Sequence, residues 1–374
     1  LTKLRKNEEK NMITIERNEL LDALNAVSKA VCGRTTMAIL ECVCLTTTGS
    51  TLILESNNME FAIRKEIPCF SDKEAVCVNA KRLLDILKKM PDTEITLEID
   101  KSFAVTLSAG KTIKFCVPGL SPETFPFAKE EDGEKLIIKA EALKEAIAGV
   151  SFCTATTETN KLMTGIQLKS TGNKVNFCGL DGHRIGSRTI TVAEAPERDY
   201  NITIPAAYLN EIVKILPSED VEITINDKNI MLKVTDTTIT TRLLAGEYFN
   251  IDQIIPHVSC MTSIKVNREQ IYAAVDRALL ILNDGTRRPV ICTIDKGRMG
   301  VTGSSAYGTV SEEIEISDMT GKDIRIGFNP KFVIDALKAV PDDFITIEFF
   351  GAKAPIIIRD NETYLYLVLP VNIN

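Results

Sequence analysis

The sequence repeats one pattern six times: a segment with helical periodicity is followed by segments in which apolar and polar residues alternate. The second, fourth and sixth copies agree best, because each ends close to a Pro, continues with an acidic turn and then alternates. Repeats of this kind constrain the architecture more than any single motif does. They predict an α+β fold of three similar domains, each with two half-units. The six predicted helical segments are Asn18–Arg34, Ala80–Met90, Lys139–Phe152, Pro205–Leu216, Arg268–Leu280 and Pro330–Val340.

The predicted domains cover residues 12–130, 135–257 and 262–374, and we expect residues 1–11 to form a disordered N-terminal extension. The extension is charged and has no apolar stretch, so it does not resemble a secretory signal. A chain of 374 residues exceeds what one hydrophobic core usually serves, which agrees with several domains. No run of about 18 apolar residues is present, so we expect no membrane-spanning segment.

Ten cysteines raise the question of disulfides or a metal site. Cys42 and Cys44 are the only close pair, and a two-residue offset on a strand places both side chains on one face without converging them on an ion. The others are single residues in apolar segments, where a free Cys behaves as a small buried hydrophobe. We therefore expect structural thiols in a reducing cytoplasm, and no metal.

Few features of the sequence indicate catalysis. It has no Walker-type glycine loop, no dinucleotide-binding fingerprint and no paired histidines at metal-binding spacing, so we expect no cofactor. Asp181, His183 and Arg184 are the best candidate for an enzymatic site, since these residue types within four positions suit acid–base work. The alternative is a tight turn after a predicted strand at Lys174–Cys178, with Asp181 and Gly182 providing the turn chemistry. We assign no catalytic residue.

Charge is distributed unevenly along the chain. It holds 44 basic and 51 acidic residues, a net charge of −7, which by itself counts against a nucleic-acid partner. The six predicted helical segments hold thirteen basic and nine acidic residues, so they sum to +4 and the remainder to −11. If these helices share one surface, it is positive on an acidic body; otherwise the basic residues are simply solvated helix faces.

The basic residues of these segments show no regular interleaving with aromatic residues, and the chain has no Trp. Base stacking, the usual grip on single-stranded nucleic acid, is therefore not expected. Contact with phosphates remains, and it predicts binding that is weak, salt-sensitive and independent of base sequence.

Four phrases resemble the bacterial DNA polymerase III beta subunits, the sliding clamps, from Met12 to the C-terminus. The phrases are MITIERNELLDALNAVSKAVCGRTTMAIL, LDGHRIGSRTI, LLAGEYFNIDQIIP and YLYLVLPV, in the family's order and spacing. The resemblance implies a head-to-tail homodimer that closes a ring of six similar domains, each of two β-α-β-β-β half-units, with helices inside and sheets outside. It also implies a non-enzymatic processivity factor that encircles duplex DNA and slides on it. Polymerase, clamp loader and repair proteins would bind through a hydrophobic peptide cleft.

The resemblance carries over three sets of residues, of which the first would face DNA. In this set Arg34 is expected at the end of the first helix, and the family's two adjacent Tyr are replaced by Lys161 and Leu162. The loss of both rings weakens any contact with single-stranded DNA there. The set comprises Arg34, Lys81, Arg82, Thr157, Asn160 and Lys161.

The second set would line the peptide cleft between the second and third domains. Two features differ from the family pattern: Asn372 replaces the usual Arg, and the run from Phe249 to Asp252 replaces Pro-Asp-Tyr-Arg. The apolar members by themselves would more often be ordinary core residues. The set comprises Met163, Leu180, Gly182, His183, Arg184, Ile185, Phe249, Gln253, Ile254, Leu367, Leu369, Pro370 and Val371.

The third set would join the first domain of one subunit to the third domain of the other. A hydrophobic pair flanked by opposite charges suits such a head-to-tail contact. The alternative for the strand at Lys114–Val117 is an ordinary edge strand that a lysine protects from aggregation. The set comprises Lys114, Phe115, Val117, Ile281, Leu282, Glu312 and Glu313.

Two functions from other classes compete with the clamp. One is a hydrolase or transferase that uses Asp181, His183 and Arg184. Replacing His183 by Ala would then abolish turnover, whereas a clamp would lose peptide binding and stay dimeric. The other is an acidic scaffold with no role on DNA, which would not be retained on circular DNA after loading.

Overall fold

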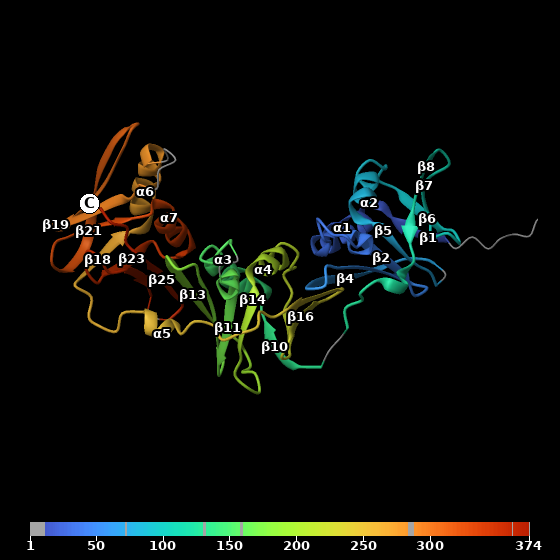
Figure 1. The fold of residues 1–374 in the computed structure, drawn as a ribbon, viewed down its shortest axis with the longest axis horizontal. Coiled ribbons are helices and arrows are strands. Elements are labelled where there is room, and N and C mark those ends of the chain that lie inside the picture. Colours follow the sequence, from blue (N-terminus) through green and yellow to red (C-terminus); the bar gives the residue numbers. More distant parts are fainter. Residues whose placement is uncertain are drawn as a thin grey trace, which may run out of the picture. The chain divides into compact units, whose positions relative to one another are not determined.

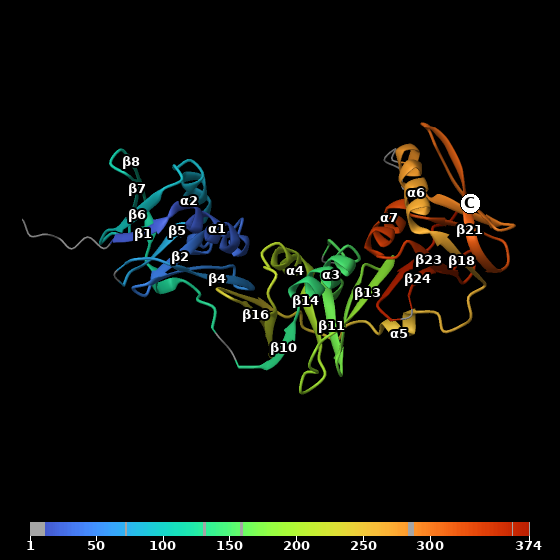
Figure 2. The same cartoon turned by 180° about the vertical axis from the view of Figure 1, so that it is seen from behind.

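The structure is a computed structural model and describes residues 12–71, 73–129, 132–157, 160–282, 288–360 and 362–373. The predicted N-terminal extension, residues 1–11, lies outside the described residues. The chain divides into two compact units: unit 1 is Leu1–Ala140 with Lys214–Arg242, and unit 2 is Glu141–Val213 with Leu243–Asn374. Figures 1 and 2 show the elements of each unit from opposite sides.

The elements repeat the order β-α-β-β-β six times, as the sequence pattern and the resemblance predicted. The first half-unit is β1 (Met12–Glu16), α1 (Arg17–Val27), β2 (Cys42–Thr47), β3 (Thr51–Asn57) and β4 (Phe61–Pro68). The second is β5 (Ala75–Asn79), α2 (Ala80–Leu87), β6 (Glu94–Ile99), β7 (Val105–Ala109) and β8 (Ile113–Val117).

The middle of the chain contributes two further half-units. The third is β10 (Glu134–Ile138), α3 (Ala140–Ser151), β11 (Gly165–Thr171), β12 (Lys174–Leu180) and β13 (Arg184–Thr191). The fourth is β14 (Asn201–Pro205), α4 (Ala206–Val213), β15 (Val221–Ile225), β16 (Asn229–Val234) and β17 (Thr237–Arg242).

The last third of the chain completes the series. The fifth half-unit is β18 (Thr262–Asn267), α6 (Arg268–Leu282), β19 (Val290–Asp295), β20 (Arg298–Ser305) and β21 (Gly308–Gly321). The sixth is β22 (Ile324–Phe328), α7 (Pro330–Ala339), β23 (Phe344–Phe349), β24 (Ile356–Arg359) and β25 (Tyr364–Val368). Short elements outside this order are η1 (Ser28–Ala30), η2 (Ala38–Glu41), β9 (Gly119–Leu120), η3 (Pro122–Thr124), η4 (Lys161–Thr164) and α5 (Ile251–Ile254).

Unit 1 contains two antiparallel sheets. One has the order β1-β6-β7-β8, and the other has the order β10-β15-β16-β17-β4-β3-β2-β5-β9. The second sheet is continuous because β17 pairs with β4, with Ile239 opposite Ile63. An ion pair of 2.8 Å between Lys65 Nζ and Asp236 Oδ1 reinforces this junction.

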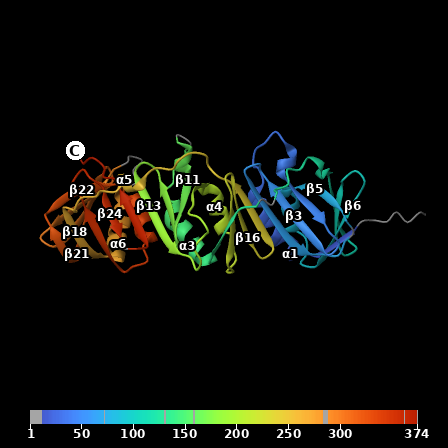
Figure 3. The same cartoon turned by 90° about the horizontal axis from the view of Figure 1, so that it is seen from below.

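In unit 2 the strands form one run with the order β14-β11-β12-β13-β25-β24-β23-β18-β21-β20-β19-β22. The pairing of β13 with β25, which sets Ile185 opposite Leu367, connects strands from the middle and the end of the chain. Figures 1 and 2 show α3, α4 and α7 on one side of these strands and α5 on the other. Seen from below, β13, β24 and β18 lie in front of α6 and α3 (Figure 3).

Asparagine caps explain where several helices begin. Asn79, Asn267 and Asn329 each precede a helix, and their side-chain oxygens accept the backbone N–H of the third, third and second following residue. A cap of this kind satisfies an N–H that has no partner inside the helix. Pro330 then occupies the first turn of α7, where its missing N–H costs nothing.

The first helix is shorter than predicted, and this corrects the expected position of Arg34. The α-helix ends at Val27, η1 continues to Ala30, and Arg34 lies exposed in the loop that follows. A backbone hydrogen bond of 3.0 Å, from the N–H of Cys32 to the carbonyl of Leu40, joins the two ends of this loop. The conformational freedom of Gly33 is also unfavourable in a helix.

Candidate functional site

A tight turn between β12 and β13 organises the candidate site in unit 2. The Asp181 carboxylate oxygen Oδ1 accepts the backbone N–H of His183 over 2.9 Å and that of Arg184 over 3.1 Å. Gly182 has a φ of +84°, in the left-handed region that glycine adopts at little cost. The predicted turn chemistry therefore holds, and it positions His183 and Arg184 at the start of β13.

Arg184 is buried, with 8% of its surface exposed. Its guanidinium group makes ion pairs, a backbone hydrogen bond and an aromatic contact. Its Nε donates to Asp181 Oδ2 over 3.0 Å, and its Nη1 donates to Asp335 Oδ2 over 2.7 Å. Its Nη2 donates to the carbonyl of Phe152. The guanidinium carbon lies 4.4 Å from the ring centroid of Phe332. Such a buried cation is tolerated because planar donors meet matched acceptors and an aromatic face.

A cleft of about 740 Å³ opens beside this arginine. Its lining combines the β12–β13 turn, the start of α7 and residues of the segment after α3. The His183 ring stacks on the Phe332 ring with centroids 6.0 Å apart. The lining residues are Thr154, Ala155, Thr156, Thr157, Asp181, His183, Arg184, Asn329, Lys331, Phe332 and Val371.

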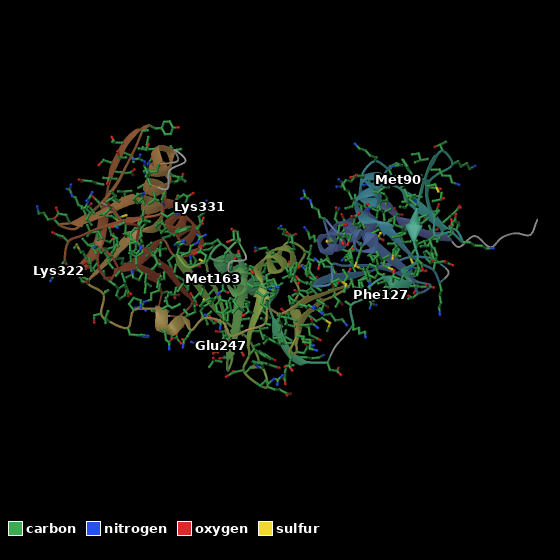
Figure 4. The ribbon with its side chains drawn as sticks, viewed as in Figure 1. Met90, Phe127, Met163, Glu247, Lys322 and Lys331 are labelled. Carbon is green, nitrogen blue, oxygen red and sulfur yellow. The ribbon has the colours of Figure 1, made fainter. Side chains whose placement is uncertain are left out.

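An apolar cluster adjoins the same turn. Its buried members include Leu180, Ile185, Tyr248 and Leu367, and Met163 and Phe249 pack against it in partly buried positions. In Figure 4, Met163 and Lys331 mark η4 and the start of α7, two of the segments that contribute to the cleft and its surroundings. A concave site with apolar walls and a few fixed polar groups suits the side chains of a short peptide.

The two ionisable side chains buried in this cluster, Cys178 and Tyr248, stay uncharged. Burial raises the pKa of the Cys178 thiol to about 12 and that of the Tyr248 hydroxyl above its ordinary value. The Tyr248 hydroxyl donates to the carbonyls of Cys178 over 3.4 Å and Gly165 over 3.5 Å, so it is fixed in place. The cluster therefore offers apolar contacts with little competing polarity.

The structure gathers most of the predicted cleft residues and separates others. Met163, Leu180, Ile185, Phe249 and Leu367 belong to the apolar cluster, whereas His183, Arg184 and Val371 line the cleft. The N–H of Leu369 donates to the carbonyl of His183 over 2.9 Å, which ties the end of β25 to the turn. Gly182 lies in the turn itself, and the other three predicted positions are the exposed Gln253 and Ile254 on α5 and the half-buried Pro370.

Sequence reasoning missed the contribution of α7 and its preceding residue. Asn329, Lys331 and Phe332 line the cleft, and Asp335 binds Arg184. These residues were assigned only to a helical repeat, because nothing in their local pattern indicates a partner 151 positions earlier. The same holds for the carbonyl of Phe152, which the end of α3 brings to Arg184.

The geometry does not support acid–base catalysis by Asp181, His183 and Arg184. Both carboxylate oxygens of Asp181 are occupied by the turn and by Arg184, so they do not activate the ring of His183. Among the described residues, no group of three or more His, Cys, Asp or Glu side chains could hold a metal ion.

The predicted DNA-facing residues lie in both units. In unit 1, Lys81 and Arg82 are exposed in the first turn of α2, and Arg34 is exposed in its loop. In unit 2, the Asn160 side chain caps η4 by accepting the N–H of Leu162 over 3.1 Å, and Lys161 is exposed beside it. Thr157 is exposed too and lines the cleft.

Two strand edges that have no neighbour among the described residues carry or adjoin the predicted interface residues. In unit 1, β8 is the last strand of its sheet, and Lys114 and Phe115 are exposed on it, whereas Val117 is buried. In unit 2, residues 308–315 of β21 pair with β20 on one side only, because β21 pairs with β18 farther along. Unpaired edges of this kind can accept another strand.

The other predicted interface residues have partners within unit 2. The carboxylate oxygen Oε2 of Glu312 accepts Arg277 Nε over 3.0 Å, and Glu313 accepts Arg298 over 2.9 Å. Leu282 is buried in the core, whereas Ile281 is half-buried. Glu312 and Glu313 therefore remain near the open edge of β21 as members of ion pairs.

Comparison with known sequence families covers nearly the whole chain. Three family models match successive parts of the chain. The model of the DNA polymerase III beta subunit, N-terminal domain, matches residues 11–129, that of the central domain matches residues 137–250, and that of the C-terminal domain matches residues 252–372. None of the helices among the described residues has the length and apolar character to cross a membrane.

Individual relatives agree with this match. The beta sliding clamp of Staphylococcus epidermidis is 28% identical over 373 residues, which cover 96% of this chain and 98% of that protein. The crystal structure of the Bacillus subtilis sliding clamp superposes with a TM-score of 0.94 at 27% identity, covering 98% of this chain and 100% of that one. A Eubacterium rectale structure, provisionally named a DNA polymerase III beta subunit, has a TM-score of 0.93 at 36% identity, with 97% and 100% covered.

Proposed function

The chain belongs to the DNA polymerase III beta subunits, the bacterial sliding clamps, and on that premise we propose that it forms a homodimeric ring around duplex DNA. As a member of this family it is a non-catalytic subunit, the processivity factor of DNA polymerase III. The proposal adds how the ring closes, what it touches and where its partners bind.

The partner site is the cleft beside His183 together with the apolar cluster around Leu180. The observation that carries this assignment is the buried Arg184, which fixes the turn against α7 through Asp335 over 2.7 Å. The cleft is thereby held open before a partner arrives, and a preformed site loses less conformational entropy on binding. Its occupants are short extended peptides with apolar anchors, carried by the replicative polymerase, the clamp loader and repair proteins.

The ring closes through the two open strand edges. Residues 308–315 of β21 in one subunit pair with β8 of the other, so the head-to-tail contact continues a sheet across the interface. Phe115, which is 39% exposed, becomes covered in this contact. The same contact made twice closes the ring and leaves neither edge free.

The basic residues contact the DNA backbone and do not recognise its base sequence. Lys81, Arg82, Arg34 and Lys161 are exposed and bind phosphates, aided by the polar Thr157 and Asn160. Contacts with phosphates carry no sequence information and weaken as salt increases. A ring does not dissociate when such contacts break, so weak binding permits sliding.

The domain boundaries of the proposal are residues 12–130, 135–257 and 262–374, with residues 1–11 as an extension. We place the protein in the cytoplasm. The cysteines of the described residues are all free thiols, which agrees with a reducing compartment.

Primer extension on a primed circular template tests the tethering function. The replicative polymerase and clamp loader of the same organism would extend the primer while excess competitor DNA traps any polymerase that dissociates. With this chain present, the products of a single binding event should lengthen at least tenfold. A reaction without the clamp loader is the control. Equal product lengths with and without the chain, both with loader, would refute the proposal.

A further inference from the structure

Four of the cysteines gather in one small cluster of unit 1, which the sequence spacing did not reveal. Cys42, Cys44 and Cys77 are buried together with Ile39, Leu40 and Phe125, and Cys32 packs against them. The ring, the DNA contacts and the peptide cleft use none of these thiols. Their arrangement is therefore open to a separate chemical role.

Within the cluster, Cys44 and Cys77 stand directly opposite each other on the antiparallel strands β2 and β5. On the same pair of strands, the N–H of Thr47 donates to the carbonyl of Glu74, its opposite residue, over 2.8 Å. Opposite pairs alternate between hydrogen-bonded and non-hydrogen-bonded types, so an offset of three places Cys44 and Cys77 in a non-hydrogen-bonded pair.

A non-hydrogen-bonded pair brings the two side chains closest together. Its Cα atoms are about 4.5 Å apart, within the range of about 4.4–6.8 Å that a disulfide spans. The other thiols of the cluster are engaged elsewhere. Cys42 faces Asn79 across the strands, and its Sγ lies 3.4 Å from the carbonyl of Ala38. Cys32 Sγ lies 3.4 Å from the carbonyl of Arg34.

We propose that Cys44 and Cys77 form a reversible disulfide between β2 and β5 when the chain meets a peroxide. The Cys44 thiolate attacks one peroxide oxygen, the O–O bond breaks, and a sulfenic acid and one water result after protonation. The Cys77 sulfur then attacks the Cys44 sulfur, the S–O bond breaks, and a second water leaves as the disulfide forms. Two thiols lose two electrons and two protons, and the peroxide is reduced to two waters.

The hydrogen bond between the two thiols decides which of them attacks the peroxide. The hydrogen bond from Cys77 lowers the pKa of Cys44, against the effect of burial, and the same bond raises the pKa of Cys77. Cys44 is therefore the nucleophile, because the thiolate is the reactive form. Cys44 and Cys77 are 1% and 0% exposed, so the reaction waits for brief opening of the strands and is slow.

Peptide mapping of the full-length chain tests the proposal without any variant. The reduced protein would be treated with hydrogen peroxide for increasing times, unfolded with N-ethylmaleimide to block the remaining thiols, and digested with trypsin without reductant. Trypsin leaves Cys42 and Cys44 on residues 35–64 and Cys77 on residues 74–81. Fragment ions must therefore assign the link to Cys44, and dithiothreitol must reverse it.

Matched serine variants separate this pair from its neighbours. Cys44→Ser and Cys77→Ser should abolish the link between the two peptides, whereas Cys42→Ser, on the same peptide and in the same buried cluster, should keep it. The expected result for the native chain is that Cys44 and Cys77 both escape maleimide and are joined to each other. The proposal is overturned if both thiols stay free for maleimide while the exposed Cys116 oxidises, or if the link involves Cys42 or Cys32 instead.

Discussion

Arg184 and Asp335 form an ion pair of 2.7 Å although 151 positions separate them in the sequence. The pair joins the first residue of β13 to the middle of α7. It also lies at the wall of the cleft that we assign to partner peptides, since Arg184 lines that cleft. Stability and partner binding therefore depend on the same contact.

Replacing Asp335 by Ala should destabilise the protein by about 2 kcal/mol, because a buried cation loses one of its two carboxylates. The free energy of unfolding from urea denaturation measures this loss. Glu313→Ala is the control, since its ion pair with Arg298 is exposed and exposed pairs contribute little. Equal effects of the two substitutions would contradict the structural role of Asp335.

His183→Ala should weaken peptide binding at least tenfold and leave the fold and the dimer intact. The ring is exposed, lines the cleft and stacks on Phe332, so its loss removes contact surface without opening the core. Fluorescence anisotropy with labelled peptides tiled across the catalytic subunit of the same organism's replicative polymerase measures the affinity. His257→Ala provides a matched control, and a cleft role for His183 fails if both variants bind alike.

Phe115→Asp should convert the dimer to a monomer. The substitution places a charge on the open edge of β8, where the proposed interface covers an apolar ring. Sedimentation velocity measures the mass in solution. Phe70→Asp changes an 82% exposed ring of the same unit that lies outside β8, and it should stay dimeric. A dimer that survives the Phe115 substitution would argue for a different interface.

Glu55→Gln should gain stability relative to the native chain as the pH rises from about 4 to 7. Burial raises the pKa of Glu55 above its ordinary value, although the N–H of Ala128 and the charge of Arg64 oppose this. A raised pKa means that the folded state holds the proton longer than the unfolded state, so the native carboxyl favours folding at low pH and loses that contribution as the pH rises.

Thermal unfolding midpoints of both proteins across this pH range measure the effect for Glu55. The backbone N–H of Ala128 donates to the carboxylate over 2.7 Å, and a glutamine oxygen can accept it in the same way. The substitution therefore isolates the charge. A difference between the two midpoints that stays constant with pH would show that Glu55 has no raised pKa in the folded state.

The fold could be predicted from the periodic pattern because helix and strand periods depend on residues that are close together in the sequence. Some helix starts coincide with a cap or a Pro close by, as at Asn79 and Pro330, and the repeated order predicted six half-units. The end of α1 was misjudged, because nothing in the apolar spacing distinguishes the helix from the loop that holds Arg34.

The candidate site was only partly predictable for a related reason. The turn at Asp181 and Gly182 depends only on residues that are adjacent in the sequence, so its chemistry was predicted. Asp335 and Phe332 come to Arg184 only through tertiary packing. Likewise, the register that sets Cys44 opposite Cys77 depends on strand pairing that the spacing of cysteines does not encode.

Retention on circular DNA tests the ring most directly. The chain would be loaded on a nicked circular plasmid by the clamp loader, and the DNA-bound fraction would be isolated by gel filtration in high salt, before and after one restriction cut. The account predicts stable retention on the circle and rapid loss once the DNA is linear, because a ring slides off a free end. Equal retention on both forms, or none on either, would contradict it.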